Sequence, residues 1–144
     1  MVRTTVWTLT LAIACVAAGT ASAAMLSKTY EFNPDAILEI GASTGDGLRL
    51  DTVRFQMPTT TGVRTASEAS VEIAISNTSE ESKRVGIGVA LFDSEGRLVG
   101  VASGGTRLVG LKPDKQKSYK LIFADLNVEA PRAATFQISV ESRP

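Results

Sequence analysis

Two carboxylates and a glycine lie close together in Asp93-Ser94-Glu95-Gly96, between two apolar runs. Carboxylate oxygens at alternate positions are typical calcium ligands, but a calcium loop supplies about six or more oxygens. This stretch offers two acidic side chains before Arg97 adds a positive charge. We therefore expect a β-hairpin in which Asp93 accepts backbone hydrogen bonds across a type I turn and Gly96 is left-handed. We assign no metal ligands.

The residues needed for most nucleophilic catalysis are missing. The chain has no histidine, and its one cysteine is Cys15. Cys-His and Ser-His-Asp pairs and the usual zinc ligands are therefore excluded. A Ser-Lys pair such as Ser82-Lys83 remains formally available, but solvent around this polar stretch would keep the lysine protonated and unreactive. We predict that the protein is not an enzyme, and we assign no catalytic residues and no cofactor.

The most basic part of the chain contains Lys112, Lys115, Lys117 and Lys120. Such a cluster could meet an anionic glycan or a lipid headgroup. However, Asp114 interrupts it, and lysines commonly protect the edge strand of a sheet from pairing with another chain. We therefore favour a solvated loop that leads into a lysine-protected edge strand.

The stretch Asn77-Thr78-Ser79 matches the acceptor pattern for N-glycosylation. Asparagine also favours turns, because its side chain can accept a hydrogen bond from the backbone two residues further on. We favour the turn.

The first residues have the pattern of an export signal. Arg3 supplies a positive charge, residues 6–18 are nearly all apolar or small, and Ala21-Ser22-Ala23 has the pattern of a cleavage site. We expect cleavage after Ala23, so that residues 1–23 form a signal peptide. The apolar stretch is shorter than the roughly 20 residues of a membrane span, and we predict no span in the mature chain.

Cys15 permits an alternative, in which Ala12-Ile13-Ala14-Cys15 is a lipoprotein box and Cys15 carries a lipid anchor. Ala12 departs from the leucine-like residue that such a box prefers. Cleavage before Cys15 would also leave a short apolar core. We therefore favour a soluble periplasmic or extracellular protein over a lipid-anchored one.

The charges balance, with 15 Lys and Arg against 15 Asp and Glu. A chain without net charge has no long-range field to attract nucleic acid, and we expect no nucleic-acid partner. Residues 24–144 are enough for one domain with its own core. Because they contain no cysteine, that domain must be stabilised by packing and not by disulfides.

After residue 23 the apolar residues recur with a period of two, which is typical of half-buried antiparallel strands. Turn-forming residues end each run. The clearest runs are residues 71–76, 85–92 and 134–141, and less regular ones are 29–32, 36–42 and 48–57. The expected connections are residues 77–84, 93–96, 103–105 and 112–114, and we expect residues 58–69 to form an exposed loop. We predict an all-β fold, an antiparallel β-sandwich.

The run 48–57 changes phase within itself. Leu48 and Leu50 share one face, whereas Val53 and Phe55 share the other, and a one-residue shift moves side chains across a sheet. We expect a bulge or corner near Asp51, where the strand could pass from one sheet to the other.

One strand face is unusually bare. Gly86, Gly88 and Ala90 lie opposite the core side of residues 85–91, and we place Ala74 and Ser76 of the preceding run on the corresponding face. Glycine within a strand often marks the close approach of another backbone or ligand. We expect the segment between residues 26 and 42 to cover this surface. An external partner is the alternative.

Residues 68–141 contain a Val/Ile alternation, a polar loop, a second alternation and then Val89-Ala90-Leu91-Phe92-Asp93. This arrangement resembles the FxLyD-type domains, immunoglobulin-like modules of exported bacterial proteins. Val89 replaces the first aromatic residue of their motif, and Phe92 replaces its tyrosine. The Leu-x-Pro-Gly turn of that family resembles Leu111-Lys112-Pro113-Asp114, with Asp114 in the glycine position. The resemblance implies an immunoglobulin-like sandwich and export, and it implies no enzymatic activity.

We therefore expect an exported, non-catalytic β-sandwich module that acts as a binding or structural domain. Its partner would be an unidentified protein or component of the cell envelope. The alternative is a subunit or accessory factor of a larger envelope assembly, and an enzyme is a distant third.

Overall fold

The computed structural model describes residues 23–34, 36–58, 60, 61, 64, 65, 68–124, 126 and 132–143. The predicted signal peptide, including Cys15, lies outside these residues except for Ala23 at its end. The described part is all β and contains no helix that is long and apolar enough to cross a membrane.

Eight strands form two antiparallel sheets. Sheet A has the order β1 (Ala24–Glu31), β10 (Ala133–Arg143), β7 (Arg84–Asp93) and β8 (Leu98–Gly105). Sheet B has the order β2 (Ile37–Ser43), β3 (Leu48–Gln56), β6 (Ser70–Asn77) and β9 (Gln116–Ile122). A short ribbon pairs β4 (Thr60–Thr61) with β5 (Arg64–Thr65).

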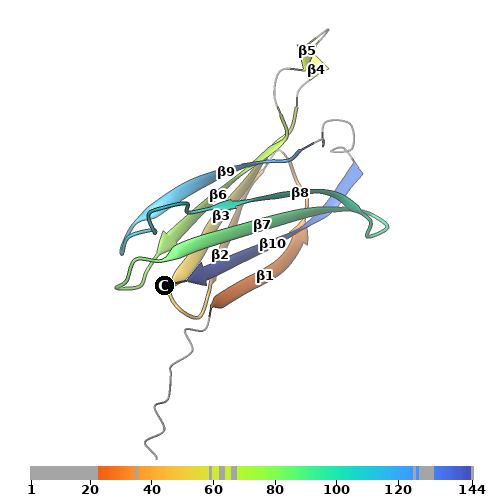
Figure 1. Cartoon of the computed structure of the whole chain (residues 1–144). Coiled ribbons are helices and arrows are strands. Elements are labelled where there is room, and N and C mark those ends of the chain that lie inside the picture. Colours follow the sequence, from red (N-terminus) through yellow and green to blue (C-terminus); the bar gives the residue numbers. More distant parts are fainter. Residues whose placement is uncertain are drawn as a thin grey trace, which may run out of the picture.

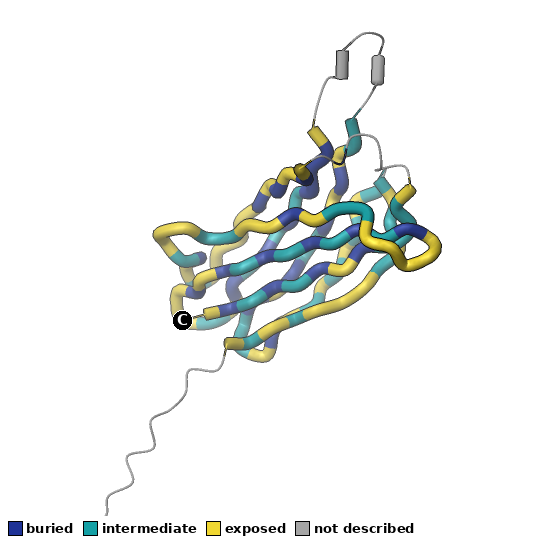
Figure 2. The backbone as a smooth tube through the Cα atoms, turned by 45° about the vertical axis from the view of Figure 1, so that its right-hand side comes forward, coloured by how far each residue is buried: buried dark blue, intermediate teal, exposed yellow. Residues whose placement is uncertain are grey.

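The two sheets stack on each other, and the core lies between them (Figure 1). Along β6 and β7 the buried residues alternate with partly exposed ones (Figure 2). In the core, the Phe55 ring lies 4.9 Å from the Phe136 ring and 4.8 Å from the Phe32 ring, centroid to centroid. The first contact joins β3 of sheet B to β10 of sheet A, and the second joins β3 to the residue that directly follows β1. The predicted all-β fold with antiparallel sheets is therefore confirmed.

The predicted bulge in β3 is also confirmed. The register of β3 against β6 shifts between Leu50 and Thr52, so residues on both sides of Asp51 face the core. However, β3 does not change sheets, because it pairs with β6 from Leu48 to Gln56 and with β2 over residues 49–54, on both sides of the bulge. Gly41 in β2, with φ 63°, lies within a register shift of the β2–β3 pair. The extra residue bends sheet B without interrupting it.

Two expected connections differ from the structure. Ser103-Gly104-Gly105 is not a loop but the last part of β8, paired with residues 86–88 of β7. At the end of the expected exposed loop 58–69, Ala69 is fully buried. Glycine and serine indicate turns only when the neighbouring chain does not offer a strand to pair with.

The strand registers define two ends of the sandwich. The turn between β7 and β8 lies at one end, which we call the hairpin end. The opposite end, which we call the loop end, carries the connections 44–47, 78–83 and 106–115. The first residues of β1 and the last of β10 also lie there.

Candidate functional site

The Asp93–Gly96 stretch forms the expected hairpin. Asp93 Oδ1 accepts hydrogen bonds from the backbone N–H groups of Glu95 and Arg97, both at 2.9 Å. Its Oδ2 accepts one from Arg97 Nε at 2.8 Å. Gly96 has φ 77°, and its N–H donates to the Asp93 carbonyl at 3.0 Å. The side chain of Asp93 therefore closes the turn.

The same contacts control the charge of Asp93. The hydrogen bond from the backbone N–H of Arg97 lowers the pKa of Asp93, and desolvation only partly opposes it. The Arg97 side chain and the Glu95 N–H lower this pKa further. Ser94 and Glu95 are exposed, and Glu95 pairs with Arg97 at 3.2 Å. Within the described residues, no three His, Cys, Asp or Glu side chains are grouped so that they could hold a metal ion.

The predicted bare face is not one surface. Gly86, Gly88 and Ala90 lie on the outer face of sheet A, whereas Ala74 and Ser76 lie on the outer face of sheet B. The two groups are on opposite sides of the sandwich. The prediction was wrong because β6 and β7 follow each other in sequence but belong to different sheets.

The expected internal cover is also absent among the described residues. β1 and β2 are edge strands of sheets A and B, and neither crosses over β7. A Cβ atom added at Gly88 would meet nothing within 4 Å, and one at Gly86 would make ordinary contacts with Glu141 at 3.6 Å. Among the residues that the structure describes, nothing covers the outer face of sheet A above these glycines.

The close approach that glycine permits is found in β8 instead. A Cβ at Gly104 would lie 2.4 Å from Leu121 Cδ2, and one at Gly100 would lie 2.5 Å from Leu126 Cδ1. Both positions face inward, as does Ala102 between them. These small residues let the edge strand β8 pack tightly against Leu121 of β9 and against Leu126, which follows β9.

Over Gly88 and Ala90, the outer face of sheet A has a shallow, open depression of about 520 Å³. The depression is deepest over Gly88 and Ala90 because glycine has no side chain and alanine has a single methyl group. Polar side chains of β10 line it on one side, and β8 and the end of β9 line it on the other. The lining outside β7 includes Gln137, Ser139, Val101, Ser103, Ile122 and Ala124.

Within the described part of the chain, the middle of this outer face carries no charge. Two cross-strand rows run over all four strands of sheet A. The rows are Thr29-Gln137-Ala90-Val101 and Ser27-Ser139-Gly88-Ser103. Ser27 contacts the Ser139 hydroxyl at 3.1 Å and accepts a hydrogen bond from Gln137 at 3.0 Å. Half-exposed Val101 and Ile122 add apolar surface. We call these two rows and the depression the neutral face.

The outer face of sheet B is different. Asp51, which the bulge turns outward, pairs with Arg49 at 3.0 Å and accepts a hydrogen bond from Gln116 at 2.9 Å. Ser76 also donates to Asp51. Asp51 therefore already has its partners within the chain, and this side of the sandwich is charged where sheet A is neutral.

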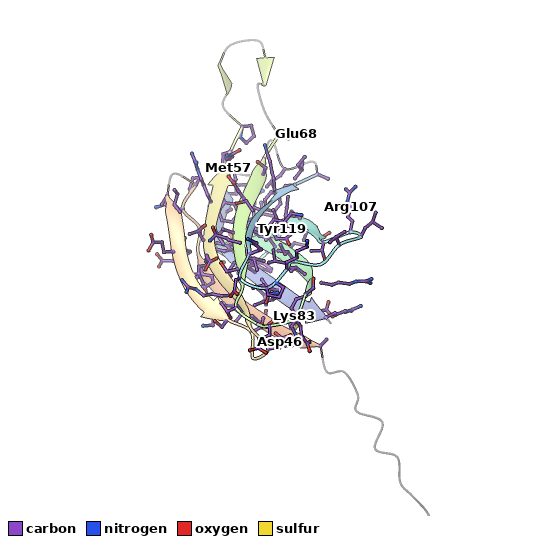
Figure 3. The ribbon with its side chains drawn as sticks, turned by 90° about the vertical axis from the view of Figure 1, so that its left-hand side faces the viewer. Asp46, Met57, Glu68, Lys83, Arg107 and Tyr119 are labelled. Atoms are coloured by element: carbon purple, nitrogen blue, oxygen red, sulfur yellow. The ribbon has the colours of Figure 1, made fainter. Side chains whose placement is uncertain are left out.

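A buried polar cluster at the loop end was not foreseen. Asp46 accepts hydrogen bonds from Thr44 at 2.6 Å and from Ser142, and the Lys83 ammonium lies 3.5 Å from its Oδ2 (Figure 3). Burial acts to raise the pKa of Asp46, but the hydrogen bonds and the charge of Lys83 together hold it below its ordinary value. Because Lys83 is held by Asp46, it is not free for the Ser-Lys chemistry considered from the sequence.

Asn77 is a turn residue, as expected, and its side chain is almost fully buried. Its Oδ1 accepts a hydrogen bond from the Ser79 N–H at 3.0 Å, and its Nδ2 donates to the carbonyls of Glu81 and Leu111 at 2.7 and 2.8 Å. A glycan would be attached to Asn77 Nδ2. This atom already donates two hydrogen bonds, which connect two loops of the loop end.

The lysine cluster has the expected structural position. β9 is an edge strand of sheet B, and the exposed Lys117 and Lys120 lie on it. Lys112 and Lys115 enclose a turn in which Pro113 is followed by Asp114 with φ 53°. Asp114, which stands at the glycine position of the Leu-x-Pro-Gly turn, therefore has a left-handed conformation.

Comparison with known proteins adds no further assignment. No protein-family model matches the chain, and a search of curated proteins gave no significant match.

Proposed function

We propose that the protein is an exported, non-catalytic binding module whose neutral face holds a protein partner. The observation that carries this proposal is the open depression over Gly88 and Ala90. Uncharged, partly apolar surface is typical of the centre of a protein interface, where charged residues are depleted. The absence of histidine from the whole chain supports a role without catalysis.

Export and an immunoglobulin-like, FxLyD-type architecture are part of the same proposal. The sequence pattern of residues 1–23 supports export. Two stacked antiparallel sheets of four strands are compatible with an immunoglobulin-like sandwich. The left-handed conformation of Asp114 adds support, because Asp114 stands at the glycine position of the Leu-x-Pro-Gly turn.

The variant Gly88→Leu tests the binding role. A leucine at this open position fills the depression, and we expect it to leave the fold intact because nothing lies within 4 Å of the new Cβ. The matched control, Ala74→Leu, places the same side chain on the outer face of sheet B. In a pull-down from the native envelope fraction, we expect Gly88→Leu to lose a protein that the wild type and Ala74→Leu both retain. Equal capture by all three would contradict the proposal.

The alternative is a subunit of a larger envelope assembly, in which the same face would bind other subunits permanently. Gel filtration with light scattering separates the two functions. A monomer supports the binding module, and a stable oligomer supports the assembly subunit.

A further inference from the structure

The connection between β8 and β9 exposes two adjacent large apolar side chains. Leu108 is 90% exposed and Val109 is 69% exposed, which makes Leu108 the most exposed large hydrophobic residue of the described chain. They lie at the loop end, away from the neutral face. We call residues 107–110 the apolar tip.

The apolar tip is held firmly at both sides. Before it, the Thr106 N–H donates to the Val85 carbonyl at 2.8 Å, and the Thr106 hydroxyl accepts from the Val85 N–H at 2.9 Å. After it, Leu111 and Lys83 exchange two backbone hydrogen bonds of 2.7 and 3.0 Å. The leucine and valine are therefore displayed on a fixed support instead of on a long loose loop.

Positive charges stand on both sides of the tip. Arg107 precedes the apolar pair and projects from the molecule (Figure 3), and Lys112 and Lys115 follow it, all three exposed. Within the same connection Asp114 is the one acidic residue. The neighbouring connection carries two acidic residues, Glu80 and Glu81. Glu80 is exposed, whereas the Glu81 carboxylate lies 3.9 Å from the Lys83 ammonium, which compensates part of the negative charge of Glu81.

We propose that the apolar tip docks the protein on an anionic lipid surface. Leu108 and Val109 would enter the boundary between headgroups and acyl chains, and Arg107, Lys112 and Lys115 would meet the phosphates. This combination of a small apolar projection and flanking cations is complementary to such a surface, whereas two apolar residues are too few for the core of a stable protein interface. Because the chain as a whole has no net charge, the attraction is local.

A tryptophan placed in the tip tests this directly. Trp7 is the one tryptophan of the chain and lies in the predicted signal peptide. The reporter Leu108→Trp is therefore made in the exported protein, with Trp7→Phe so that no second tryptophan contributes. The matched control is Leu98→Trp, which puts the same reporter at the exposed leucine of the hairpin end. With vesicles of phosphatidylglycerol and phosphatidylcholine, we expect the emission of Leu108→Trp to shift to shorter wavelength and to be quenched by brominated lipid. The control should not change.

A second comparison tests the charges. Arg107→Ser combined with Lys112→Ser should weaken binding about 25-fold, since each cation contributes about fivefold near an anionic surface. Lys120→Ser, which removes a lysine further along β9, should have little effect. The proposal is overturned if vesicles leave the Leu108→Trp emission unchanged, if they shift both reporters equally, or if pure phosphatidylcholine binds as well as the anionic mixture. A shift that follows protein concentration without vesicles would assign the tip to a second copy and also overturn it.

Discussion

Gly96 is the residue on which the β7–β8 hairpin most depends. Its φ of 77° lies in the left-handed region, where a residue with a branched Cβ is strained, and the Asp93 carboxylate fixes the turn around it. We expect Gly96→Val to lower the free energy of unfolding by about 1–3 kcal/mol. Urea denaturation measures this loss.

Gly45→Val is the matched control for that change. Gly45 also lies in a turn, but its φ is not positive and a Cβ there would meet nothing within 4 Å. Its replacement should therefore have a much smaller effect. If both variants lose the same free energy of unfolding, the left-handed conformation of Gly96 is not the cause of the loss in Gly96→Val.

The two aspartates with lowered pKa predict how stability depends on pH. A carboxyl whose pKa is lower in the folded than in the unfolded chain stabilises the fold above its unfolded pKa, near pH 4. That contribution disappears as the pH falls through the folded pKa. Asp46 and Asp93 both have lowered pKa values, so stability should fall as the pH drops below about 5 and through their folded pKa values.

Replacing either aspartate by asparagine removes its titration. Asp46→Asn and Asp93→Asn should each be less stable than the wild type at neutral pH and should lose less stability on acidification. Thermal melts across this pH range measure the slope. A wild-type slope that neither variant reduces would show that other carboxyls control the acid sensitivity.

At the scale of elements, the packing of β8 depends on its inward glycines. A valine at Gly104 would press on the buried Leu121, and overpacking of this kind costs about 1–3 kcal/mol. The same change at Gly88 in β7 meets open space. We expect urea denaturation to show a clear loss for Gly104→Val and none for Gly88→Val. A larger loss of stability for Gly88→Val than for Gly104→Val would show that the close approach is at Gly88, as the sequence alone suggested.

These glycines show which parts of the fold could be predicted. The hairpin at Gly96 and the inward residues of β6 and β7 follow from local patterns, since alternation shows which residues share a strand face. Alternation does not show which sheet a strand joins. Assigning Ala74 and Gly88 to one surface therefore failed, and the contact of Gly104 with Leu121 could not be foreseen from the sequence.

The same reason explains the unexpected cluster at the loop end. Asp46, Lys83 and Ser142 come from three distant parts of the chain, and only the pairing of strands brings them together. The centre of the depression could be predicted from the sequence, because Gly88 and Ala90 are small. Its walls on β8 and β10 depend on which strands flank β7.

At the scale of the whole molecule, export predicts the mature N-terminus. If residues 1–23 are removed, mass spectrometry of the exported protein should find Ala24 as its first residue. A protein that keeps Met1 would contradict export by this signal. A lipid on Cys15 would show that the lipoprotein alternative is correct.

We propose that the neutral face of sheet A, and not the outer face of sheet B, binds a partner. The most direct measurement is photo-crosslinking in the cells that produce the protein, with the crosslinking residue at Ala90 or, as a control, at Ala74. We predict a discrete protein adduct from Ala90 and none from Ala74. An adduct from Ala74 alone, or none from either position, would contradict the claim.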